Sequence, residues 1–360
     1  MGITAHVNYS NRALQAFKLG SLLAGRLSQD YRFGDFKSVV ISTIITTPYG
    51  DYTRSGTSRY GTPTEVEDET QELICTQDKA FSKTIDKGNA KDQQYLKKAG
   101  RVVALMLKEQ GIPMTDLYGF RTLAAKAGKI VGSGTALSKS NICDRISDGT
   151  VYLDDQEVPA DGRTLFVTPA GYKLLRMSDE FIKVESLAQK SLAQGKVGEY
   201  DNMDVVKVPG SRWPANVNFM IVHKSAACLP MKIEETKIHQ DPPGISGNLL
   251  EGRQYYDCFV FGRRSAGIYV DVDTSSGKGT VLSAPTVAAD GTVTQADAVL
   301  IQYTTDGSDP RYSTTAKIVA TGAKAVHAAG DTIRAVALGG QSGTADGSFS
   351  SPVAEKKATS

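Results

Sequence analysis

Hydrophobic positions change their spacing several times along this chain of 360 residues, and each change marks a different kind of element. Apolar residues spaced three and four positions apart predict helices, whereas short alternating or continuous apolar runs predict strands. Residues 1–35 hold one marginal helical stretch, around Leu14 to Leu27. Because a short isolated helix is barely stable in water, we expect these residues to form an arm that needs a neighbouring surface.

Residues 36–88 predict a long two-stranded excursion. A β-rich run at 38–45 leads into a polar, glycine-rich stretch, which returns through an acidic strip to an apolar strand at 73–75. A loop of this length with little to bury usually works by contacting another molecule.

Tyrosine, arginine and glutamate side chains gather in this excursion. Tyrosine and arginine are enriched at protein interfaces, but they also stack on bases and contact phosphates. We favour a protein contact, because the acidic strip would repel a polyanion and opposite charges suit pairing with copies of the same chain. The expected contact residues are Tyr49, Tyr52, Arg54, Arg59, Tyr60, Glu65, Glu67 and Glu69.

The strongest helical stripe covers residues 90–110, with Asn89 as N-cap and with Gly111 and Pro113 as stop signals. A second helix is expected from Thr115 to Ala127. Short strands and one further helix, capped by Thr168, follow. Strands are expected at 165–167, 219–222, 231–233, 259–261 and 267–270, so the class is α+β.

The composition falls to linker residues at 273–280, and residues 281–360 then read as a small all-β module. Strands are expected at 299–303, 317–319 and 332–337, at the spacing of a β-sandwich. Residues from Ala354 onward read as a frayed tail. Because the module has its own strands, we expect a chain ending near Val272 to assemble without it.

Charge and cysteine content narrow the functional classes. The net charge of +2 gives no reason to expect a tight nucleic-acid partner, and 40% hydrophobic with 22% charged residues is typical of a soluble globular chain. Four widely spaced cysteines match no metal-binding spacing, so we expect reduced, mostly buried thiols. We find no secretion signal and no apolar run of membrane-spanning length, and we expect synthesis in the cytoplasm.

Catalytic motifs are missing from the sequence. Neither a phosphate-binding loop nor a nucleophile elbow is present, and the histidines are scattered. His223 follows a buried run and is expected to be a satisfied core residue. The acidic strip is a weak candidate for a metal or for paired carboxylates. We therefore expect no enzymatic activity, no cofactor and no metal.

The order of elements, together with the stretch from Val158 to Pro169, resembles the major capsid protein of tailed bacteriophages, with its Hong Kong 97-type fold. That stretch is similar to the "VP-x-x-x-R-x-L-x-V-x-P" pattern of the axial domain. The resemblance implies an N-arm (1–35), an extended loop (36–88), a spine helix and second helix (89–128), an axial domain (137–230) and returning strands (231–272).

The same resemblance implies a function. Hexamers and pentamers of the chain would form an icosahedral head around packaged double-stranded DNA, which the shell would contact weakly. The implied partners are portal, scaffolding and cement proteins, and the implied place is the virion, after assembly in the host cytoplasm. Some family members cross-link a loop lysine, but the tip between Tyr49 and Gly61 contains none.

The last module has a resemblance of its own, carried by residues 303–310. This octapeptide is similar to the chitobiase C-terminal type of immunoglobulin-like domain, and its turn residues are Asp306, Gly307, Asp309 and Pro310. It implies a module on the outer surface that binds host glycans, decorates the shell or clamps neighbours, with Tyr303 and Tyr312 as the candidates for sugar stacking. The alternative function is a secreted carbohydrate-binding or carbohydrate-active protein.

Overall fold

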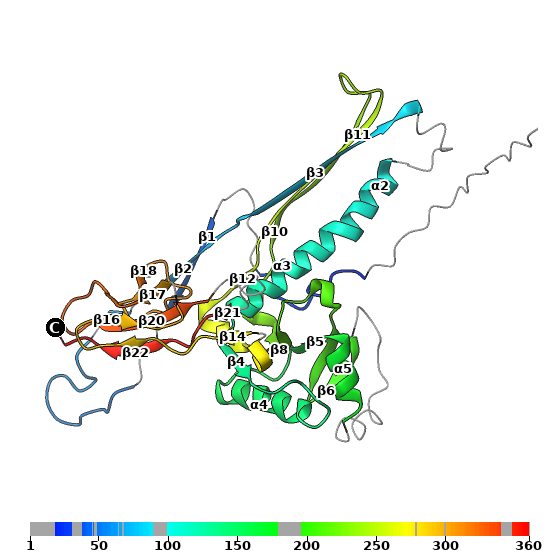
Figure 1. The fold of residues 1–360 in the computed structure, drawn as a ribbon. Coiled ribbons are helices and arrows are strands. Elements are labelled where there is room, and N and C mark those ends of the chain that lie inside the picture. Colours follow the sequence, from blue (N-terminus) through cyan, green and yellow to red (C-terminus); the bar gives the residue numbers. More distant parts are fainter. Residues whose placement is uncertain are drawn as a thin grey trace, which may run out of the picture.

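A computed structural model describes residues 19–30, 38–44, 46, 49–63, 65–66, 68–88, 99–178, 196–277, 279–298, 300–339 and 348–359. A body of sheet and helices lies at the centre (Figure 1). A long ribbon of strands with a helix beside it projects from one end of the body, and a β-rich module projects on another side.

A six-stranded mixed sheet forms the centre of the body. Its order is β4-β13-β8-β5-β7-β6, in which β4/β13 and β5/β7 are parallel pairs and the other pairs are antiparallel. The strands are β4 (Lys129–Ser133), β5 (Arg163–Val167), β6 (Lys196–Tyr200), β7 (Met203–Lys207), β8 (Val217–His223) and β13 (Ile268–Asp273). The sheet therefore takes strands from both sides of the expected axial range.

Each face of this sheet is covered by a separate hydrophobic core. Strand β8 directs Met220 and Val222 into the core shared with α3 (Ile112–Ala125), and Phe219 and Ile221 into the core shared with α4 (Ile142–Asp155) and α5 (Pro169–Arg176). Both faces are buried, which explains why the sequence of β8 is continuously apolar rather than alternating. The expected cap of α5 is confirmed, because the Thr168 side chain accepts a hydrogen bond from the Gly171 amide.

Arg163 explains the pattern that linked residues 158–169 to capsid proteins. The arginine is buried, and its guanidinium donates to the carbonyls of Val158 and Pro159 and to Asp154 at 2.7 Å. Because three hydrogen bonds from one planar group tie the incoming loop to the end of α4, a lysine at this position makes fewer of these contacts.

The long helical segment does not stop where expected. Helix α2 (Ala99–Met106) passes through one π-helical turn, η1 (Leu107–Gly111), directly into α3. Pro113 lies in the first turn of α3, where its missing N–H costs nothing, and the π turn absorbs the irregularity. Gly111 packs closely on β11, since a Cβ there would lie 3.0 Å from the end of the Gln254 side chain. The expected cap Asn89 lies outside the described residues.

The expected excursion is divided between two sheets. Strands β1 (Ser38–Ile44) and β2 (Asp68–Ile74) form an antiparallel pair, which confirms a two-stranded element. Strand β3 (Gln77–Asp86) instead joins β10 (Met231–Gln240) and β11 (Gly247–Tyr256) in a separate ribbon. The register with β11 runs over all ten residues of β3, a long-range pairing that no local pattern reveals.

Residues 19–30 of the N-terminal arm pack on their own chain, so this part does not need the expected neighbour, while the rest of the arm lies outside the described residues. Leu22, Leu23 and Leu27 are buried in the core beneath α3. Residues 19–27 form turns rather than the expected helix, because Asp116 accepts the Leu22 amide and Gly25 adopts φ +77°.

Among the described residues after 279, the regular elements are all strands. They form the sheets β14-β21, β15-β16-β19 and β18-β17-β20-β22. The expected frayed tail is wrong, because β22 (Ala354–Lys357) pairs with β20 and Ala358 is buried in the module core. The remaining bounds are β14 (Thr280–Val281), β15 (Thr286–Val287), β16 (Thr292–Thr294), β17 (Leu300–Thr304), β18 (Lys317–Ala320), β19 (Ala323–Lys324), β20 (Thr332–Leu338) and β21 (Ser348–Phe349).

Two short strands and four 3₁₀ turns complete the described fold. The strands β9 (Ala227–Cys228) and β12 (Phe259–Val260) pair with each other, and the turns are η2 (Gly210–Arg212), η3 (Lys224–Ala226), η4 (Gly262–Gly267) and η5 (Ser275–Gly277). All four cysteines are free and buried, as expected. No helix in the described ranges is long and apolar enough to cross a membrane.

Candidate functional site

The tip of the extended loop presents its aromatic side chains to solvent. Tyr49 and Tyr60 are almost fully exposed, and the Tyr52 and Tyr60 rings meet edge to face with centroids 5.0 Å apart. The Thr53 amide donates to the Arg59 carbonyl at 3.1 Å, which closes the tip. Large aromatic side chains exposed at one loop tip are typical of a surface that another protein covers.

The charged residues of the loop occupy different places. Arg54, Arg59 and Glu65 are exposed at the tip, whereas Glu67 lies outside the described residues. Glu69 lies on β2 nearer the body, where its carboxylate forms an ion pair with Arg263 at 3.3 Å. The structure therefore places the predicted tyrosines and arginines together at the tip, whereas Glu69 forms an ion pair within its own chain.

The root of the loop is tied to the body by a buried carboxylate. Asp257 accepts hydrogen bonds from the Thr76 amide at 2.8 Å, the Tyr118 hydroxyl at 2.7 Å and the Cys258 amide at 2.7 Å. Burial and the neighbouring Asp257 carboxylate raise the pKa of Tyr118, which keeps this hydroxyl protonated as a donor. Asp257 therefore links the start of β3, the long helix and the strand end at Cys258.

Turn residues of the C-terminal module organise a loop that runs from the surface into the contact with the body. Gly307 adopts φ +79°, and the Asp306 carboxylate accepts from the Ser308 amide at 3.0 Å. Burial acts to raise the pKa of Asp306, but hydrogen bonds from Ser308 and Thr315 outweigh it and lower that pKa. Asp306 and Gly307 lie exposed at the surface, whereas Pro310 is buried and Asp309 pairs with Arg311. The turn itself is therefore exposed, and the residues that follow it lead into an internal contact.

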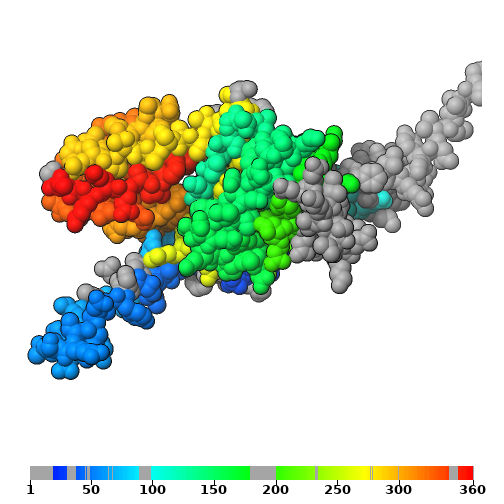
Figure 2. All heavy atoms as spheres, turned by 90° about the horizontal axis from the view of Figure 1, so that it is seen from below, coloured from blue at the N-terminus to red at the C-terminus, as the bar shows by residue number. Residues whose placement is uncertain are grey.

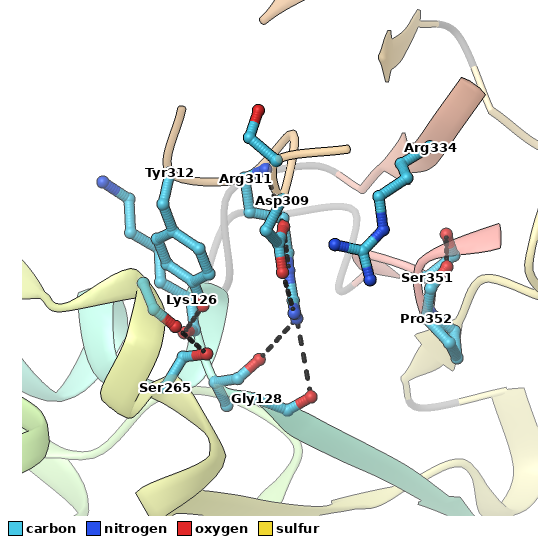
Figure 3. Close-up of polar contacts among 12 residues, drawn as sticks. Lys126, Gly128, Ser265, Asp309, Arg311, Tyr312, Arg334, Ser351 and Pro352 are labelled. Atoms are coloured by element: carbon cyan, nitrogen blue, oxygen red, sulfur yellow. Dashed lines mark hydrogen bonds and ion pairs between the residues drawn. The ribbon is translucent and has the colours of Figure 1, made fainter. Parts of the chain in front are cut away.

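Arg311 and Tyr312 dock the module onto the end of α3 (Figure 3). The Tyr312 hydroxyl donates to the Lys126 carbonyl at 2.6 Å, and Arg311 donates to the Ala127 carbonyl at 3.0 Å. Burial raises the pKa of Tyr312 to about 12, so its hydroxyl remains a donor at neutral pH. A cation and a donor placed just beyond a helix C-terminus satisfy carbonyls that the helix leaves unpaired.

The two tyrosines expected to stack on sugars are not available for stacking. Tyr303 is 3% exposed inside the module core, and Tyr312 is 7% exposed in the core beneath α3. The chain folds both rings inward because each hydroxyl has a backbone partner, Val326 for Tyr303 and Lys126 for Tyr312. The expectation that these rings lie on the surface is therefore wrong.

His223 behaves as expected of a satisfied core histidine. Its Nε2 contacts the Asp161 carbonyl at 2.9 Å and its Nδ1 contacts the Ser225 hydroxyl at 2.8 Å. Burial lowers the pKa of His223, which favours the neutral ring. Over the described ranges the structure brings together no group of three potential metal ligands.

Three contacts were not predicted from the sequence. They are the Asp116–Arg212 ion pair beneath the arm, the hydrogen bonds that Asp257 accepts at the root of the loop, and the contact of Arg311 and Tyr312 with the end of α3. The first two join residues about a hundred or more positions apart and leave no local signal. The third had one available signal, since Arg311 and Tyr312 directly follow the recognised turn.

Comparison with known proteins supports one fold. No protein-family model matches the chain, and no curated protein matches it. Among solved structures, a chain of Mycobacterium phage Che8 is similar at a TM-score of 0.58 and 16% identity, over 77% of this chain and 100% of that one. A chain from the capsid of cyanophage P-SCSP1u reaches a TM-score of 0.61 at 11% identity, over 75% of this chain and 93% of that one.

A chain from the mature capsid of bacteriophage PhiM1 gives a TM-score of 0.59 at 14% identity, over 76% and 92% of the two chains. The protein is therefore of the α+β class and has the fold of phage capsid chains, as its sequence resemblance implied. Nearly the whole of each relative is matched, while about a quarter of this chain is not. That share is comparable in size to the segment from residue 281 to 360.

Proposed function

We propose that this chain is the major capsid protein of a tailed phage and assembles into hexamers and pentamers of an icosahedral head around double-stranded DNA. The observation that carries the proposal is the match of its fold to almost the full length of phage capsid chains. The chain is then a structural protein of the virion without enzymatic activity. Near-neutral charge suits a container that contacts packaged DNA weakly.

The extended loop supports self-assembly on physical grounds. Its first strand, β1, exposes Val40 and Ile44 on one face, and its tip exposes Tyr49 and Tyr60. A two-stranded ribbon with this much uncovered apolar surface is marginal alone and gains stability from a neighbour. We assign that role to a second copy of the chain, with Arg54, Arg59 and Glu65 pairing across the contact.

The C-terminal module is proposed to lie on the outer surface of the head. The module and the part of the extended loop formed by β1, β2 and the tip project from the same side of the body (Figure 1, Figure 2). An immunoglobulin-like sandwich, and the portal, scaffolding and cement partners implied by the resemblance, remain predictions. Glycan binding loses support, because the expected stacking rings are buried.

Assembly of the purified chain tests this function. Wild-type protein, expressed with a scaffolding partner where one is needed, should give uniform closed particles by electron microscopy and sedimentation. Replacing both Tyr49 and Tyr60 with serine should shift material from particles to free subunits, at least tenfold if each ring contributes about 1 kcal/mol or more to the contact.

A matched control separates this contact from a general loss of apolar surface. Val326 is 71% exposed on the module, and Val326→Ser should leave particle yield unchanged. Circular dichroism of the tyrosine variant should match that of the wild type, because both rings lie outside every core. Persistent soluble monomers of the wild type, with or without scaffold, would refute the proposed function.

A further inference from the structure

The 3₁₀ turn η4 lies where the module, the long helix and the root of the extended loop meet. On the helix side, the Gly128 amide donates to the Ser265 carbonyl at 3.0 Å. The approach is close, since a Cβ on Gly128 would lie 2.4 Å from that oxygen. Residue 128 and η4 are thus in direct backbone contact.

On the module side, Tyr312 packs on the first residue of η4. A Cβ on Gly262 would lie 2.9 Å from the Tyr312 Cβ, and the Tyr312 hydroxyl interacts with Ser265 as well as with the Lys126 carbonyl. Ser265 in turn donates to the Gly262 carbonyl at 2.8 Å. The Tyr312 side chain is therefore wedged between η4 and the end of α3 (Figure 3).

On the loop side, Gln71 of β2 holds the start of η4 with both ends of its amide. Its nitrogen donates to the Val260 carbonyl at 2.8 Å, and its oxygen accepts from the Gly262 amide at 2.9 Å. Glu69, two residues earlier on β2, pairs with Arg263 of the same turn. The turn that packs against Tyr312 is therefore also the turn that Gln71 and Glu69 of β2 contact.

We infer that the C-terminal module is a brace acting within its own chain, which fixes the direction of the extended loop through η4. Gly262 carries the coupling, because its Cα faces Tyr312 while its amide binds Gln71. When Tyr312 packs against η4 and binds the Lys126 carbonyl, η4 is held in one position. Gln71 and Glu69 of β2 then find their partners Gly262 and Arg263 in place. The partner of the module's inward face is therefore the chain's own helix end.

Hydrogen exchange on the purified full-length chain tests the brace. In Tyr312→Phe the ring stays but its hydroxyl is lost, and the amides of Gly262, Gly128 and Thr76 should exchange about fivefold faster. Tyr303→Phe is the matched control, because it removes a buried hydroxyl from the module core away from η4. It should accelerate exchange at Val326 and leave those three amides unchanged.

The inference is supported if the amides of Gly262 and Gly128 and, in the loop, that of Thr76 all exchange faster in Tyr312→Phe while those of β5 keep their protection. It is overturned if the Thr76 amide is unchanged, or if β5 loses protection to the same extent, since that would be general destabilisation. Tyr312→Ala, which also removes the wedge, should give a larger acceleration at the same amides. All readouts lie within one chain, so the result stands apart from whether shells assemble.

Discussion

Replacing Arg212 with glutamine should release the N-terminal arm and destabilise the body. Arg212 is 3% exposed and donates to Asp116 at 2.9 Å, to the Gly20 carbonyl at 2.7 Å and to the Leu19 carbonyl at 2.9 Å. Asp116 is fully buried, so the substitution leaves its charge without a cation. Removing one partner of a buried pair typically costs about 3–5 kcal/mol.

Trp213 provides the assay. It is the only tryptophan of the chain, lies beside Arg212 in sequence and packs on Phe120 at a centroid distance of 5.3 Å. Urea unfolding followed by its fluorescence should show a midpoint lowered by an amount equivalent to about 3–5 kcal/mol. Tryptic cleavage after Arg26 should accelerate in the folded protein, because the arm loses its anchor.

Two further variants make the reasoning refutable. Arg253→Gln breaks an exposed ion pair with Asp78 and should leave the midpoint unchanged within error. The double variant Asp116→Asn with Arg212→Gln removes both charges and should lose less stability than Arg212→Gln alone. An Arg212→Gln midpoint equal to that of the wild type would show that the pair does not anchor the arm.

Two other predictions concern the module and pH. A chain ending at Val272 should fail to give soluble, assembly-competent protein, because it loses Tyr312 and Phe349 from the core beneath α3. This revises the expectation from sequence. Solubility and particle yield measure the effect, and normal particles would contradict it. The pKa of His223 is lowered in the folded state, so as pH falls the unfolded chain protonates this histidine before the folded chain does. The contribution of His223 to the free energy of unfolding is therefore fully present above about pH 6.5 and is lost as pH falls through the folded pKa. Thermal unfolding between about pH 7.5 and about pH 5 should show the loss, and His223→Asn should flatten it; equal slopes for both proteins would exclude His223 as the cause.

Elements that depend on residues close together in the sequence could be predicted. The continuous apolar run of β8, the Thr168–Pro169 start of α5 and the turn at Gly307 each depend on neighbours within a few residues, and all three occur as expected. The helix end at Pro113 was predicted wrongly from equally local evidence. Proline is compatible with the first turn of a helix as well as with its end, and only the π turn at Leu107–Gly111 shows which applies.

By itself, the sequence determined the α+β class, the exposed tyrosine-rich tip, the buried cysteines and the resemblance to capsid proteins, because periodicity and residue type are local properties. Tertiary structure alone decided which strand β3 joins, that Arg212 anchors the arm, and that Tyr312 faces the body rather than a sugar. These outcomes depend on pairings across roughly a hundred residues or more, where a buried charge or hydroxyl must find a partner. Such partners are chosen by the packing of the whole chain.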